Sequence, residues 1–247
     1  MKRSVGLMSV LLSVGFAASA HAKDSGFEVG ARLGLGLPLG DAVGSSEDEE
    51  DLDFDEDSSS SDKLSEGVSR KIPLQLDVGY RLSPQLMLGG FFQYAFASVG
   101  KQLEEGCETE GVSCSARVLR LGLQAMYHFT PITAGSAGWI GGGIGYEWLK
   151  LGLEGGDIEF DATIKGFEFL NVQGGYDFVV NDKFRVGPYV LFSLARYAST
   201  SLSLSGDAID ELEEEFGEEF QGESQDIDDK AFHGWLSFGV KATFGAL

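Results

Sequence analysis

The sequence predicts one all-β domain, an eight-stranded antiparallel up-and-down transmembrane β-barrel with long acidic extracellular loops. Three observations lead to this fold class. Eight segments alternate apolar residues with glycine or polar residues at a period of two, the pattern of strands with two unlike faces. Short and long connections alternate between these segments. An export leader precedes them, and no later apolar run reaches the roughly 18 residues that a transmembrane helix needs.

Residues 1–22 have the features of a signal peptide. Lys2 and Arg3 form a basic start, an apolar run follows over 5–15, and Ala-His-Ala at 20–22 matches the small-x-small cleavage pattern. The apolar run is shorter than the roughly 20 residues that cross a bilayer. We therefore expect a mature chain that begins at Lys23, with residues 23–247 forming the outer-membrane β-barrel domain.

The first strand is expected at 27–37 and the second at 72–82. The third strand follows a tight turn at 83–85, and the fourth is expected at 117–129. In the first segment every odd position is apolar and every even position is glycine or charged. A helix would bury Gly30, Gly34 and Gly36 in its interior at about 1 kcal/mol each, which favours the strand.

The other four strands are expected at 139–148, 164–178, 184–194 and 232–244. The sixth segment of the series, 164–178, is the least regular. Pro188 in the seventh cannot donate a backbone hydrogen bond, which predicts a bulge at that position.

The connections between these strands alternate in length. Those at 83–85, 130–137 and 179–183 are short, whereas those at 40–70, 99–116, 151–162 and 198–230 are longer. Short periplasmic turns and long extracellular loops are typical of outer-membrane barrels. An even number of strands would return the C-terminus to the periplasmic side.

The negative charge of the chain is concentrated in two of the long loops. The formal net charge is −21, and residues 41–66 and 207–229 each contain 12 of the 39 acidic residues. The acidity therefore belongs to loops at about 40–70 and 198–230, whereas the rest of the chain is nearly balanced. Such a charge excludes nucleic acid as a partner, because its phosphates would be repelled.

Two other all-β architectures compete with the membrane barrel. A soluble lipocalin-like barrel would place its aromatic residues inside, but the small face of these strands carries too little apolar material for a dry core. A secreted β-sandwich would need charged outer faces, which these strands lack.

The chain resembles the small eight-stranded outer-membrane barrels of the OmpA/OmpX/OmpW-like group. The resemblance covers residues 26–247 as an architecture. It is sharpest in the last strand, which is similar to the C-terminal assembly signal of that group through Ser237, Gly239, Ala242 and Phe244, although the chain continues to Leu247. The segment 187–190, Gly-Pro-Tyr-Val, is also similar to a common strand start in such barrels. The resemblance implies a Gram-negative outer-membrane location, contact with membrane lipids and lipopolysaccharide, and insertion by the outer-membrane assembly machinery.

No catalytic or cofactor site is expected. By register, His128 and His233 point into the lumen, with His128 near the periplasmic end and His233 near the outer rim, and neither has a serine and an acid at a recognisable spacing. The glycine run 141–145 lacks the Lys-Ser/Thr of a phosphate loop and precedes no helix. We expect a non-enzymatic protein without cofactors.

The first acidic loop contains a series that is similar to the opening of a calcium loop: Asp51, Asp53, Asp55 and Asp57. The glycine required at the sixth position of such a loop is Glu56 here, so a dedicated calcium site is not expected. Weak divalent-cation binding by the series is one interpretation. A solvated acidic loop is the other, and the composition favours it.

Cys107 and Cys114 are the two cysteines of the chain and lie in one predicted loop. An exported protein favours a disulfide between them over free thiols.

Charged residues of both signs are predicted to share the narrow lumen. They are Glu28, Arg32, Asp77, Arg81, Arg120, Glu147, Asp177, Arg185 and Lys241. An unpaired buried charge costs several kcal/mol, so we expect ion pairs across the interior and a largely blocked lumen.

The leading functional interpretation is a non-enzymatic outer-membrane protein whose acidic loops contact ions, envelope components or partners. Passage or binding of small molecules through the lumen, as in OmpW-like barrels, is the alternative, and a lipid-modifying enzyme is third.

Overall fold

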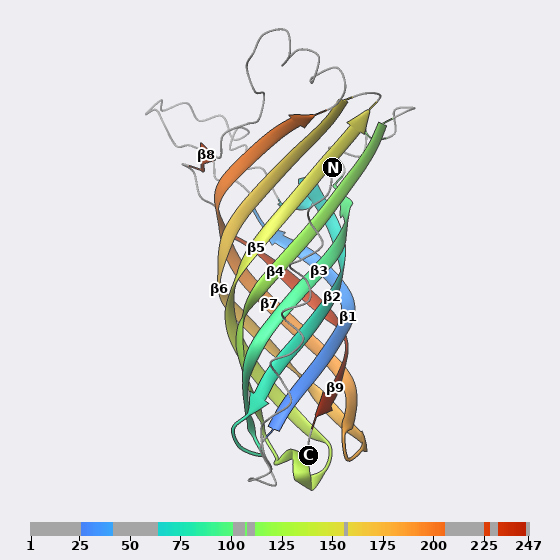
Figure 1. Cartoon of the computed structure of the whole chain (residues 1–247), viewed down its shortest axis with the longest axis vertical. Helices are drawn as coiled ribbons and strands as arrows, with labels where there is room; N and C mark the ends of the chain where they lie inside the picture. Colours follow the sequence, from blue (N-terminus) through green and yellow to red (C-terminus); the bar gives the residue numbers. More distant parts are fainter. Residues whose placement is uncertain are drawn as a thin grey trace, which may run out of the picture.

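Eight long strands close into one antiparallel barrel (Figure 1). The structure is a computed structural model that describes residues 26–41, 64–100, 107, 112–155, 158–205, 225–227 and 232–245. The barrel strands are β1 (Gly26–Gly40), β2 (Val68–Arg81), β3 (Leu86–Val99), β4 (Val112–His128), β5 (Ala137–Gly155), β6 (Ile158–Asn181), β7 (Phe184–Ser205) and β9 (Phe232–Gly245). Three short elements accompany them: α1 (Leu64–Gly67), η1 (Ile132–Ala134) and β8 (Gln225–Asp226).

The strand order closes the sheet on itself. β1 pairs with both β2 and β9, β9 pairs with β7, and β7 pairs with β6, all antiparallel. β8 adds two residues to the outer part of β7 and is not a wall of the barrel. The predicted closed, eight-stranded, up-and-down barrel is therefore confirmed. Among the described residues, no helix is long and apolar enough to cross a membrane.

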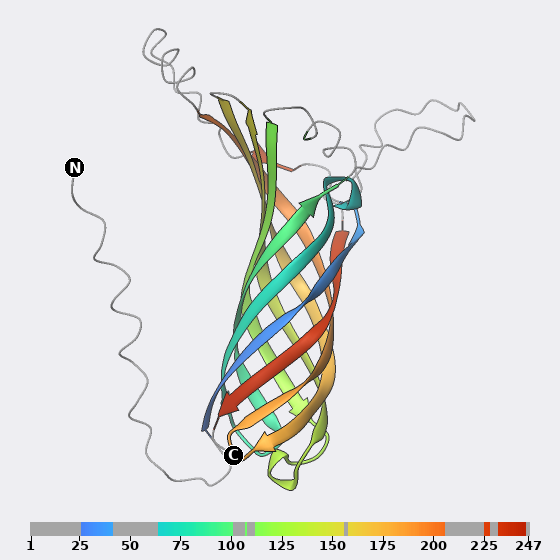
Figure 2. The same ribbon diagram turned by 90° about the vertical axis from the view of Figure 1, so that its right-hand side faces the viewer.

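The two ends of the barrel differ in their connections. At the end where β1 begins and β9 finishes, residues 82–85, 129–136 and 182–183 join neighbouring strands (Figures 1 and 2). We call this the turn end and the opposite end the loop end. The predicted loop at 151–162 is wrong, because β5 runs to Gly155 and β6 starts at Ile158.

Four strands continue past the loop-end rim that β3 and β9 reach. β4 starts at Val112, inside the loop predicted at 99–116, and β7 reaches Ser205, inside the loop predicted at 198–230. Figure 2 shows the outer parts of β4, β5, β6 and β7 standing above the other strands. These parts also alternate, but in the opposite sense to the barrel wall. On β5, Leu149, Leu151 and Leu153 continue the interior face, whereas Lys150 and Glu154 lie on the outer face.

Pro188 does not form the predicted bulge. It pairs with Val240 of β9 in unbroken register. The ladder to β6 is interrupted between Gly175 and Phe178 but resumes in the same register. The missing N–H of proline thus removes ladder bonds without inserting an extra residue. The irregularities lie elsewhere in the β6–β7 ladder, near residues 165–170 and 179–181, and the first of these is within the segment that the sequence marks as least regular.

The outer face carries an apolar band between two groups of aromatic residues. Near the turn end, Phe27 packs against Tyr80 and Tyr176 against Phe178. Toward the loop end, aromatic pairs are Tyr94–Phe96, Tyr146–Trp148 and Phe169–Phe232. Exposed leucine, valine and isoleucine side chains lie between the two groups; Leu123 is 67 % exposed. This face therefore has the composition of a lipid-facing surface rather than of a water-facing one.

The inner face is closed by an apolar cluster at the loop end. Leu64 of α1 packs there with Val68, Val118, Leu149 and Trp235, and all five are at most 2 % exposed. α1 is not one of the barrel strands, but it lies at the loop-end mouth of the barrel and contributes Leu64 to the interior cluster. Nothing in the residue pattern indicates this contact, because α1 is a single helical turn beside an acidic segment.

Candidate functional site

The interior of the barrel holds all nine charged residues that the sequence places there, each at most 2 % exposed. Alternation along each strand turns these side chains inward, away from the apolar band. They form three layers of ion pairs and hydrogen bonds, stacked from the turn end to the loop end.

The layer at the turn end is built on two carboxylates. Arg81 donates two hydrogen bonds to Glu28, from Nε to Oε1 and from Nη2 to Oε2, each at 2.7 Å. Arg185 Nη2 also donates to Glu28 Oε1, at 2.6 Å. Asp177 lies 3.1 Å from His128 Nε2 and accepts a bond from Trp139 Nε1 at 3.1 Å. The ammonium group of Lys241 lies 3.5 Å from the same carboxylate.

The middle layer centres on Asp77. Arg32 Nε donates to Asp77 Oδ2 at 2.6 Å, and the amides of Gln75 and Gln124 donate to Oδ1 at 2.8 Å each. Arg32 also bonds to Gln173, and its guanidinium lies 5.4 Å from the centre of the Tyr189 ring. The chain of glutamines continues through Gln93, which links Gln75 to Arg120.

The upper layer joins Arg120 to two glutamates. Its Nε donates to Glu168 at 2.6 Å and lies 3.7 Å from Glu147. Glu147 in turn accepts bonds from Tyr197 Oη at 2.8 Å and Trp235 Nε1 at 3.0 Å, and lies 3.1 Å from His233 Nε2. Both histidines therefore point into the lumen as predicted, each beside a carboxylate.

Large side chains fill the space beside inward glycines. A methyl group on Gly122 would lie 2.6 Å from the ring of Phe91, and one on Gly175 would lie 2.8 Å from the indole of Trp139. These inward glycines therefore accommodate rings from neighbouring strands.

Two charged members of the network were missed by sequence reasoning. Lys71 lies one residue before the expected start of its strand, and Glu168 lies at an irregularity of the β6–β7 ladder. Period-two counting within the expected bounds cannot recover either position. Lys71 would have been found by extending the β2 alternation one step toward the loop.

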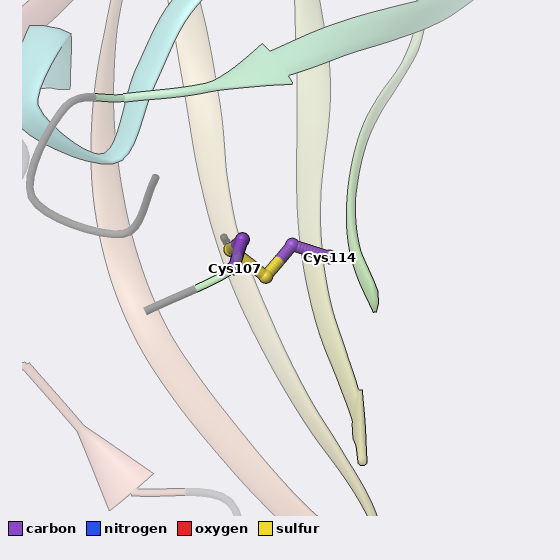
Figure 3. Close-up of a disulfide and its surroundings, with 2 residues drawn as sticks. All are labelled: Cys107 and Cys114. Carbon is purple, nitrogen blue, oxygen red and sulfur yellow. A yellow bond between two sulfur atoms is a disulfide. The ribbon is translucent and has the colours of Figure 1, made fainter. Parts of the chain in front are cut away.

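The remaining predicted site residues lie outside the lumen network or outside the described residues. Cys107 and Cys114 form a disulfide at the outer end of β4 (Figure 3). Ser237, Gly239, Ala242 and Phe244 all lie on β9, with Phe244 exposed on the outer face. The predicted signal peptide, Lys23, and the acidic series Asp51, Asp53, Asp55 and Asp57 lie outside the described residues.

Comparison with known proteins identifies the fold. A major outer membrane protein from Thermus thermophilus is 13 % identical over 91 % of this chain and 100 % of its own, with a TM-score of 0.50. OprG from Pseudomonas aeruginosa is 11 % identical over 91 % and 98 %, with a TM-score of 0.48. Neisserial surface protein A is 12 % identical over 90 % and 98 %, with a TM-score of 0.43. No curated protein matches the sequence.

A family model described as outer membrane protein beta-barrel domain matches residues 8–187, which is more than half of the chain. This match confirms the resemblance to small outer-membrane barrels that the alternating strands indicate. The chain belongs to the outer membrane protein beta-barrel family.

Proposed function

We propose that the chain spans the outer membrane as a sealed, non-enzymatic barrel that holds its acidic loops and outer strand ends at the cell surface. There they contact ions, envelope components or a partner. The observation that carries this proposal is the filled interior: three layers of paired charges and an apolar cluster occupy the lumen from one end to the other.

The height of the apolar band supports a transmembrane position. On β4 the outward apolar positions run from Leu119 to Phe129. Ten residues at roughly 3.4 Å each, tilted by about 40°, give a height of about 26 Å, close to the apolar band of about 25 Å in outer-membrane barrels. Aromatic residues at both edges match the two interfaces of a bilayer.

The same interior weighs against passage of small molecules. A path through the lumen would have to separate Arg32 from Asp77 and Arg120 from Glu168, pairs whose members are at most 1 % exposed. Breaking a buried pair leaves an uncompensated charge and costs about 3–5 kcal/mol. It would also have to displace Leu64 from the mouth.

The placement of the histidines weighs against a lipid-modifying enzyme. Such an enzyme needs a general base that lipid can reach at the barrel edge. His128 is 1 % exposed and His233 is fully buried, and both face the lumen. Each lies beside a carboxylate inside the network, where it contributes to packing rather than to chemistry on a substrate.

The part of the molecule available for contacts is therefore the loop end. The outer ends of β4 to β7 rise above the rim there, and the Cys107–Cys114 disulfide fastens the start of β4 (Figures 2 and 3). Export through cleavage after Ala22 and insertion guided by the β9 signal would place this end outside the cell.

Protease access in whole cells tests the proposal. An epitope replacing residues 50–56 should be accessible to antibody on intact cells, and proteinase K should remove it while leaving the barrel intact. A matched epitope inserted at 182–183, in a turn at the opposite end, should be reached only after the outer membrane is permeabilised. Equal access to both epitopes, or access to the second alone, would contradict the proposed orientation.

A further inference from the structure

Three basic side chains gather on the outer face of the barrel toward the loop end. Arg117 of β4 is directly opposite Lys150 of β5, and Lys150 is directly opposite Thr163, two residues from Lys165 on β6. We call Arg117, Lys150 and Lys165 the basic cluster. They line a hollow of about 520 Å³ whose other walls include Tyr94, Trp148 and Ser201. Figure 1 shows β4, β5 and β6 side by side at this height.

The basic cluster brings three like charges close together, and the nearest carboxylates on this face, Asp161 and Glu154, line a second hollow that Arg117 and Lys150 share. Like charges directly opposite each other on neighbouring strands destabilise a sheet, and the diagonal pair of Lys150 and Lys165 lies only about 7–8 Å apart. Within the described part of the chain, no carboxylate forms an ion pair with any of the three cations. In the lumen, by contrast, five cations form ion pairs with carboxylates: Arg32, Arg81, Arg120, Arg185 and Lys241. An anion from outside the described barrel would relieve the repulsion in the cluster.

The depth of the cluster identifies the kind of anion. Arg117 lies two positions beyond Leu119, the last outward apolar residue of β4, which places it about 5 Å above the apolar band. Trp148 and Tyr94, at the edge of that band, form the lower wall of the hollow. Leu121, Ile144 and Phe167 lie below them as exposed apolar side chains. A ligand that fits has a negatively charged head at the height of the cations and apolar chains directly beneath it.

We infer that the basic cluster binds the phosphate group of a phosphorylated lipid in the outer leaflet, with the acyl chains lying along Leu121, Ile144 and Phe167. The inference rests on the membrane position proposed above. A guanidinium and two ammonium groups offer charge-assisted hydrogen bonds to phosphate oxygens. The hydroxyl groups of Thr163 and Ser201, which line the same hollow, supply further donors. In a Gram-negative outer membrane the lipid with this chemistry in the outer leaflet is the lipid A part of lipopolysaccharide.

Lipid A binding to the refolded protein tests the inference. The triple variant R117S/K150S/K165S is compared with the control R70S/K183S/R196S, which removes the same charge from outward or turn positions outside the cluster. Each protein is refolded in a neutral detergent, and bound bisphosphorylated lipid A is quantified by native mass spectrometry. The cluster variant is expected to bind lipid A at least about tenfold more weakly than the wild type, and the control no more than about twofold more weakly. The charge-retaining variant R117K/K150R/K165R should bind like the wild type.

Further arms separate the possible failures. Flotation with phosphatidylcholine vesicles reports membrane insertion independently of lipid A, so loss of wild-type flotation would refute the proposed function itself. Normal flotation with equal lipid A binding by the wild type and the cluster variant would refute the basic cluster alone. Competition by millimolar inorganic phosphate that abolishes lipid A binding would make the cluster a free-anion site and also overturn the inference. If the triple variant fails to fold, K150S alone carries the test, because Lys150 lies between the other two cations.

Discussion

Inside the barrel, the ammonium nitrogen of Lys71 lies 3.7 Å from the centre of the Trp235 ring, and the indole N–H of Trp235 donates to Glu147. A buried cation and a buried carboxylate are thus connected through one aromatic residue. The lysine nitrogen has no hydrogen-bond partner among the described residues. The face of the Trp235 ring is therefore the contact that the described residues offer this nitrogen.

Glu147 is the residue on which this upper layer depends most. Glu147→Gln would remove the negative charge beside Arg120 and Lys71 while keeping the shape of the side chain, so it should lower the free energy of unfolding by about 3 kcal/mol or more. Urea unfolding in lipid vesicles, followed by tryptophan fluorescence, measures this change. Glu154→Gln, on the exposed outer part of β5, is the matched control and should change it by less than about 0.5 kcal/mol. Equal effects of the two variants would mean that the network does not stabilise the barrel.

Changes in α1 and changes in the acidic segment that precedes it should have different effects on the stability of the barrel. Replacing residues 44–60 with a short Gly/Ser linker should leave heat-modifiable migration on gels unchanged, because insertions in surface loops cost little closure entropy. Leu64→Ala should instead destabilise the protein by about 2–4 kcal/mol, since Leu64 is 1 % exposed in the cluster beside Trp235. Ser65→Ala, at the exposed neighbouring position, is its control. A stable Leu64→Ala variant would show that α1 does not stabilise the barrel.

The disulfide should protect both cysteines from alkylation. Maleimide labelling of the native protein without reductant is expected to modify neither Cys107 nor Cys114, and labelling after reduction and unfolding should modify both. Mass spectrometry of the labelled protein gives the count. Two labels in the absence of reductant would contradict the bond.

Export should remove the leader. Intact-mass measurement of protein from the outer-membrane fraction is expected to give a chain that begins at Lys23, because Ala-His-Ala at 20–22 fits signal peptidase. A mass that includes residues 1–22 would refute the processing site.

One physical reason explains why the sequence predicts the strand positions and most of the charged side chains that point into the lumen. A strand with one face toward lipid must alternate, so the apolar residues of β1 or β9 also locate the inward residues Arg32 and Lys241. The outer ends of β4 to β7 escaped prediction because their alternation is reversed: apolar residues such as Val118 and Leu149 lie on the interior face, and polar residues such as Lys150 lie on the outer face.

The identity of the ion pairs could not be predicted in the same way. Arg81 meets Glu28 because β1 and β2 are neighbours, but Arg120 of β4 meets Glu168 of β6 across the interior. Such pairs depend on the tilt and stagger of the whole barrel. Glu168 was lost for a further reason, since the irregularity beside it reverses the alternation on which the prediction relies.

Conductance of the refolded protein in planar lipid bilayers tests the sealed lumen most directly. Insertion is verified beforehand by flotation with vesicles, and a large porin serves as the positive control. With Glu28, Asp77, Glu147 and Asp177 each held by cationic partners, the wild-type barrel should show no stable porin-sized steps. Stable porin-sized conductance from inserted wild-type protein would contradict the sealed barrel and favour passage through the lumen.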